Sequence, residues 1–99
     1  MEVKLHITEE HISKGERYSY YQCPIALAIQ DLLPHVGVTV GAFMVHYWIG
    51  KHRPDLNCSY YLRPETDRWR IAFDRGETVS PAVLIVDVPD ELITEKESE

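Results

Sequence analysis

The chain has 99 residues, of which 44% are hydrophobic and 26% are charged, and these shares predict one globular domain and argue against disorder of the whole chain. The formal net charge is −6, but residues 87–99 hold six carboxylates against one lysine, which leaves the rest of the chain close to neutral. A nearly neutral body argues against a nucleic-acid partner and against mimicry of DNA by charge.

The expected location follows from the chain start, the apolar stretches and the cysteines. The first residues, MEVKLHITEE, lack the basic and apolar regions of a signal peptide. The longest apolar stretches are well short of the roughly 20 residues that cross a membrane. We therefore expect a cytoplasmic protein with no membrane partner, in which Cys23 and Cys58 stay as free thiols.

Apolar periodicity and turn residues predict two main helices, one short helix and several strands. The first strand alternates apolar and polar residues, and the first main helix begins at Pro24, a residue favoured at the first helical position. Residues 50–57 are rich in turn formers and predict an exposed loop. The expected elements, in chain order, are a strand over 3–7, a short helix over 9–14, a helix over 24–33, strands over 36–40 and 43–49, a candidate short strand over 59–62, a helix over 64–75 and a strand over 82–86.

The middle of the chain predicts a β-hairpin. The alternation of apolar and polar residues over 36–49 changes phase at Gly41-Ala42, as it does at a tight turn or a bulge. A two-residue loop with glycine first is typical of a type II′ turn. We favour two paired strands, and one long bulged strand is the alternative.

Together these elements predict an α+β fold, a small and mostly antiparallel sheet of four to five strands with two main helices and one short helix packed on one face. The domain is expected to span residues 1–89. Residues 90–99 are expected to form an acidic, disordered tail.

No residue pattern indicates catalysis, a cofactor or a metal ion, and we expect that the protein is not an enzyme. The five histidines are scattered, and no pair has the close spacing of zinc ligands. Cys23 precedes a helix, where the dipole can activate a thiol, but a buried N-cap is the favoured interpretation. Asp67 and Asp74 have arginine neighbours, which predicts weak ion pairs on a solvated helix face. A cap of the turn near Gly76 is the alternative for Asp74.

Aromatic residues suggest a binding surface. Adjacent residues in a strand point to opposite faces, so one of Tyr47 and Trp48 should pack inward and the other outward. Filling of the core is the favoured interpretation of the aromatic residues as a set. Exposed aromatic residues are also typical of recognition surfaces, and stacking on nucleotide bases is a third interpretation. The candidate partner-binding residues are Trp48, Met44, His46, Tyr20, Tyr21, Tyr60 and Tyr61.

Three stretches carry a family resemblance: HITEEHISKG over 6–15, CPIALAI over 23–29 and FDRGETVSP over 73–81. In this order they resemble a family of small uncharacterised bacteriophage and prophage proteins. The chain departs from the family in the last strand, AVLIVDV, which lacks the expected aromatic residue, in its aromatic-rich middle and in its acidic tail.

The resemblance implies a phage-type accessory protein in the cytoplasm of a bacterial host cell, and it carries no catalytic residues. Such a protein would bind a host protein, and the most specific form of this hypothesis is an inhibitor of a bacterial defence system. A homodimer or other homo-oligomer is the alternative, because the uncovered sheet face would then be a subunit interface. A small enzyme or nucleotide-binding protein that uses Cys23 or the arginines is the third hypothesis.

Overall fold

The fold was analysed in a computed structural model that describes residues 1–49, 53–90 and 92, except for the side chains of residue 49 and residues 53–57. The α+β class is confirmed. The elements are β1 (Glu2–Ile7), α1 (Glu9–Lys14), α2 (Pro24–Leu32), β2 (Gly37–Gly41), β3 (Met44–Ile49), β4 (Arg53–Tyr61), α3 (Pro64–Asp74) and β5 (Ala82–Asp87).

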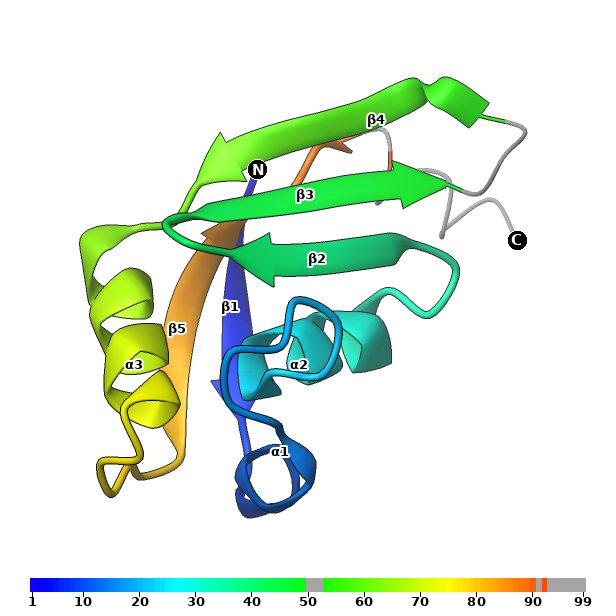
Figure 1. The fold of residues 1–99 in the computed structure, drawn as a ribbon. Coiled ribbons are helices and arrows are strands. Elements are labelled where there is room, and N and C mark those ends of the chain that lie inside the picture. Colours follow the sequence, from blue (N-terminus) through cyan, green and yellow to red (C-terminus); the bar gives the residue numbers. More distant parts are fainter. Residues whose placement is uncertain (50–52, 91, 93–99) are drawn as a thin grey trace.

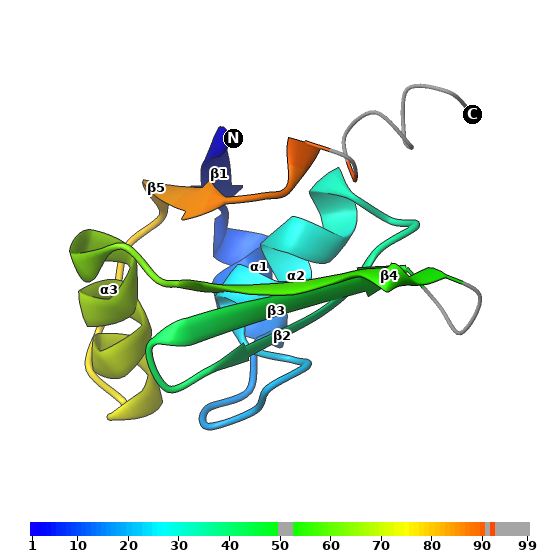
Figure 2. The ribbon, with the colours of Figure 1, turned by 90° about the horizontal axis from the view of Figure 1, so that it is seen from above.

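The five strands form two antiparallel sheets. β1 pairs with β5 along its whole length, and β2, β3 and β4 form a three-stranded sheet in that order. In Figure 1, β1 and β5 pass behind the three-stranded sheet and run across its strands. Figure 2 shows α2, β1 and β5 all on one side of this sheet, so among the described elements these cover one of its two faces.

The core lies between the three-stranded sheet and the layer formed by α2, β1 and β5. Val45 and Tyr47 enter it from β3, Ile25 from α2 and Leu5 from β1, and each is at most 2% exposed. Leu92 is also fully buried, so the core extends beyond the expected domain boundary at residue 89. The rest of the expected acidic tail lies largely outside the described residues.

The β-hairpin is confirmed, but its turn lies one residue later than the sequence predicted. Gly41 pairs with Met44, so Ala42 and Phe43 form the loop. The positive φ of 53° belongs to Phe43, at the second loop position, and the expected type II′ turn, with glycine first, is therefore wrong. The structure nonetheless places two paired strands where we favoured them over one long bulged strand.

The expected loop over residues 50–57 is also wrong in part, because β4 begins at Arg53. Turn-forming residues such as Pro54 led to the prediction of a loop in place of this strand. Proline is tolerated on an edge strand, where its missing N–H leaves no bond of the sheet unmade, and β4 is an edge strand of the three-stranded sheet. The first three residues of the expected loop lie outside the described residues.

Candidate functional site

No helix of the described chain covers the outer face of the three-stranded sheet, which is turned toward the viewer in Figure 1. The buried residues of β2 and β3 point to the core, so their neighbours in sequence point outward. The described side chains on this face include no aspartate, glutamate, lysine or arginine. They are Thr39, Met44, His46, Trp48, Ser59 and Tyr61, placed opposite one another by the strand register.

Trp48 has a structural role on this face. A Cβ atom built on Gly37 would lie only 2.2 Å from Cε2 of Trp48, so the indole covers the bare backbone of the strand beside it. The ring centroids of Trp48 and His46 are 5.7 Å apart, and Nδ1 of His46 lies 2.6 Å from Oγ of Ser59. The half-buried Trp48 therefore packs onto its own sheet.

Tyr20 joins the face from the loop over residues 16–22. The N–H of Val40 donates to the Tyr20 carbonyl at 2.9 Å, which holds this loop along the edge of β2. The Tyr20 ring reaches Gly41 and is 61% exposed. It borders a hollow of about 290 Å³ whose other walls include Met44 and His46, so the structure brings three of the predicted contact residues together.

Phe43 and Tyr61 form an exposed pair at the end of the same face. Their ring centroids are 6.4 Å apart, their planes differ by 23°, and their side chains are 56% and 73% exposed. Sequence reasoning missed Phe43 because a turn placed one residue too early assigns it to the inner face. We refer to Tyr20, Phe43, Met44 and Tyr61 as the aromatic end of the sheet.

Two of the predicted contact residues lie apart from the aromatic end. Tyr60 is half-buried on the inner face, where its ring meets Tyr47 edge-on at 6.3 Å. Tyr21 is 56% exposed, but it does not line the hollow that Tyr20 shares with Met44 and His46. Its carbonyl accepts a hydrogen bond from Nε2 of Gln30 at 3.0 Å.

A second hollow, of about 270 Å³, lies between the loop over residues 16–22 and the β2–β3 turn. We call it the socket, with walls that include Tyr18, Ser19, Tyr20, Ala42, Arg70 and Asp74. Tyr18 is 73% exposed and has a φ of 58°. Its N–H donates to Oδ1 of Asp74 at 2.9 Å.

An ion-pair cluster of α3 borders the socket. Arg70 donates to Asp67 at 2.8 and 3.0 Å and to Asp74 at 3.0 Å. Asp74 is only 6% exposed, so the expectation of a solvated helix face with weak ion pairs is wrong for this residue. The sequence could not show that the loop over residues 16–22 would fold over the end of α3 and bury the carboxylate.

Cys23, the candidate nucleophile of the sequence, also lines the socket. It is the N-cap of α2, and its Sγ accepts from the N–H of Ala26 at 3.4 Å. The residue is 3% exposed, and burial raises the pKa of its thiol. This environment favours the neutral thiol, as the N-cap interpretation predicts, and it does not activate a nucleophile.

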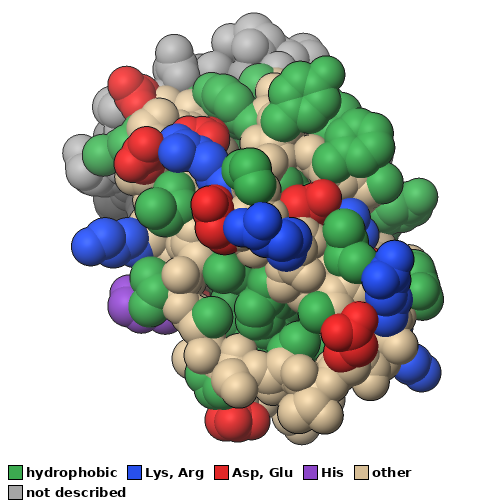
Figure 3. Space-filling view, turned by 90° about the vertical axis from the view of Figure 1, so that its left-hand side faces the viewer, with side chains coloured by type: hydrophobic (Ala, Val, Ile, Leu, Met, Phe, Trp, Pro, Cys, Tyr) green, Lys and Arg blue, Asp and Glu red, His purple; other side chains and the backbone are tan. Residues whose placement is uncertain are grey.

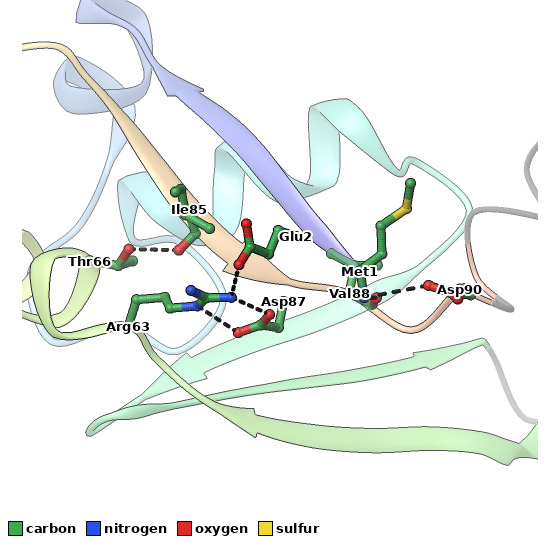
Figure 4. A network of polar contacts seen from close by, with 8 residues as sticks. All are labelled: Met1, Glu2, Arg63, Thr66, Ile85, Asp87, Val88 and Asp90. Atoms are coloured by element: carbon green, nitrogen blue, oxygen red, sulfur yellow. Dashed lines mark hydrogen bonds and ion pairs between the residues drawn. The ribbon is translucent and has the colours of Figure 1, made fainter.

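Polar contacts drawn in Figure 4 connect the start of α3 to β1 and β5, the two strands of the two-stranded sheet. Arg63 donates from Nε and Nη2 to the two carboxylate oxygens of Asp87, at 3.0 and 2.9 Å, and from Nη2 to Glu2 at 2.8 Å. The Thr66 hydroxyl donates to the Ile85 carbonyl at 2.8 Å. This network fixes the position of the chain two residues after Tyr61.

Charge is distributed differently on the side of the molecule formed by α3. Figure 3 shows acidic and basic side chains interspersed over this helix, with hydrophobic side chains gathered where it borders the outer face of the three-stranded sheet. Within the described part of the chain, no group of three or more histidine, cysteine, aspartate or glutamate residues could hold a metal ion. None of the described helices has the length and apolar character needed to span a membrane.

Comparisons with protein-family models, curated proteins and solved structures found no match to this chain.

Proposed function

We propose that this protein acts by binding another protein through the aromatic end of its three-stranded sheet. One observation carries the proposal: exposed rings and a methionine gather on a sheet face whose described side chains carry no lysine, arginine or carboxylate. Interface centres are enriched in tyrosine, phenylalanine and methionine and depleted in lysine and carboxylates. Neighbouring exposed aromatic side chains are also costly in water unless something covers them for part of the time.

The same face supports a protein partner better than a nucleic acid. Binding to single strands combines aromatic stacking with basic groups that follow the phosphates. The described side chains of this face offer rings without such basic groups, which agrees with the nearly neutral body of the sequence. We likewise propose no enzymatic activity, because the buried, neutral thiol of Cys23 is a poor nucleophile.

The sequence resemblance suggests the kind of organism and partner in which this binding would take place. A phage-type accessory protein in the cytoplasm of a bacterial host would use the aromatic end to occupy a surface of a host protein. Inhibition of a bacterial defence system is the most specific version. The competing version is a homodimer in which two aromatic ends cover each other, since the described side chains of this face include no lysine, arginine or carboxylate that would repel a second copy.

The test is capture from a bacterial host lysate with the wild-type protein and two matched variants. Tyr61→Ser removes a ring that is 73% exposed, and Tyr21→Ser removes one that is 56% exposed and lies outside both hollows. We expect a partner that wild type and Tyr21→Ser capture and Tyr61→Ser does not. Equal capture by all three proteins would contradict the proposal.

Light scattering separates a host partner from a second copy of the chain. A monomeric wild type that captures a partner supports the host-protein version. A wild-type dimer that Tyr61→Ser converts to a monomer supports the homodimer instead. Trp48→Ala is a poor test of binding, because removal of the indole also uncovers Gly37.

A further inference from the structure

The socket beside the aromatic end has its own chemistry. We propose that it receives one basic side chain, an arginine or a lysine, from the partner protein. This inference rests on the proposed function and specifies what the partner must present. It concerns Tyr18, Tyr20 and the cluster of Asp67, Arg70 and Asp74, of which only Tyr20 was among the contact residues predicted from the sequence.

The size of the socket indicates a single side chain. Its volume is about 270 Å³, below the roughly 300–1,000 Å³ of pockets that hold drug-sized ligands. The socket opens between two exposed segments, the loop over residues 16–22 and the β2–β3 turn. A long side chain projecting from a partner surface can enter such an opening without either protein changing its backbone.

The charge of the ion-pair cluster that borders the socket indicates that this side chain is a cation. The walls of the socket contain one carboxylate, that of Asp74, and one guanidinium, that of Arg70. Arg70 also donates to Asp67, which lies beside the socket and not in its walls, so the cluster of the three residues carries one more negative charge than positive. Because Asp74 is 6% exposed, water screens its charge less than it screens a surface carboxylate. An entering guanidinium or ammonium group would balance this charge.

The rings around the socket favour the same chemistry. Tyr18 and Tyr20 line it and are 73% and 61% exposed, and aromatic faces attract lysine and arginine cations. Asp74 accepts from the Tyr18 N–H, so the carboxylate of the socket also holds the loop that carries both rings.

An anion is the opposite possibility, because α2 begins at the socket and a helix N-terminus attracts negative charge. The donors at this helix start are largely unavailable. Pro24 has no N–H, and the N–H of Ala26 already donates to Sγ of Cys23. The wall also holds the Arg70 guanidinium, but this group already donates to Asp67 and Asp74. The Asp74 carboxylate beside it would repel an anion.

The test is an NMR titration of the ¹⁵N-labelled full chain with N-acetyl-arginine methylamide and with its neutral analogue, N-acetyl-citrulline methylamide. We expect the arginine probe to shift the amide signals of Tyr18, Ser19 and Ala42 in a saturable way. The citrulline probe should bind at least about fivefold more weakly, which corresponds to about 1 kcal/mol for one cation on aromatic rings. Equal binding of the two probes, or no saturable shift with either, would overturn the proposal.

Two variants connect the signal to the socket. Tyr20→Leu should weaken the arginine probe while the spectrum of the fold persists, and Tyr21→Leu, on the neighbouring exposed ring, should leave binding unchanged. Asp74→Asn keeps an oxygen that can accept from the Tyr18 N–H but removes the charge, and should also weaken binding. If lysate capture depends on Tyr61 while the arginine probe does not bind, the socket proposal fails and the proposed function stands.

Discussion

Phe43 lies at the tip of the β-hairpin in a backbone conformation that suits glycine. Its φ is 53°, and an L-residue in the left-handed region costs about 1–2 kcal/mol relative to an ordinary conformation. The Phe43 side chain is 56% exposed and its ring stacks only on Tyr61 among the described rings. The structure therefore predicts an unusual stability ranking for three residues at this position.

The magnitude follows from three contributions. Phe43→Gly relieves the strain, about 1–2 kcal/mol, loses an exposed ring stack of about 0.5 kcal/mol, and adds backbone entropy to the unfolded chain worth about 0.5–1 kcal/mol. The glycine variant should thus be about as stable as the wild type. Phe43→Ala loses the ring but keeps the strain, so it should be less stable than the glycine variant by about 1 kcal/mol.

Urea unfolding followed by tryptophan fluorescence measures this difference, because it shifts the midpoint at constant slope. Ala42→Gly is the matched control on the neighbouring loop residue, whose φ is not positive. The Ala42→Gly variant should be less stable than the wild type by about 0.5–1 kcal/mol. If glycine destabilises both positions equally, Phe43 does not have a left-handed backbone and the reasoning is refuted.

Two further predictions concern the sheet and the start of α3. Gly37→Ala should unfold at a lower temperature than wild type, because its Cβ would lie 2.2 Å from the Trp48 indole, and the Trp48→Ala background should remove most of that difference in a double-mutant cycle by thermal melting. Arg63 holds the pKa of Asp87 below its usual range. As the pH falls, the Asp87 carboxylate therefore stays charged in the folded protein at pH values where the unfolded chain already takes up a proton. The stability that this difference contributes is complete above about pH 5 and is lost as the pH falls through the folded pKa. Urea unfolding at several pH values should show a smaller loss of stability below pH ~4 in Arg63→Met than in wild type, and an equal loss would contradict the assignment.

The sequence predicted those parts of the fold that local patterns encode. Alternation located β1, a continuous apolar run located β5, and proline at the first helical position located the starts of α2 and α3. It could not show that the strands divide into two sheets, because strand pairing across the chain leaves no local signal. It also missed the beginning of β4, since turn residues are tolerated on an edge strand.

The residues of the candidate site were predicted only where strand alternation determines which face of the sheet a side chain occupies. Tyr47 points inward and Trp48 outward, as the sequence predicted for one of the two. The same rule separates Tyr60 from Tyr61 but cannot say which one is exposed unless the register is known. Tyr18 and Phe43 were not predicted, because their exposure depends on a left-handed backbone in a loop and in a turn.

These two residues connect the strain in the structure to the proposed function. Tyr18 and Phe43 are the two non-glycine residues with positive φ within the described ranges, and both are exposed aromatic residues. Glycine would satisfy either backbone at lower cost, so stability alone does not explain a large ring at both places. One ring borders the socket and the other belongs to the aromatic end, and Tyr20 lies in the walls of both hollows. A partner that covered this continuous surface would account for both strained positions together.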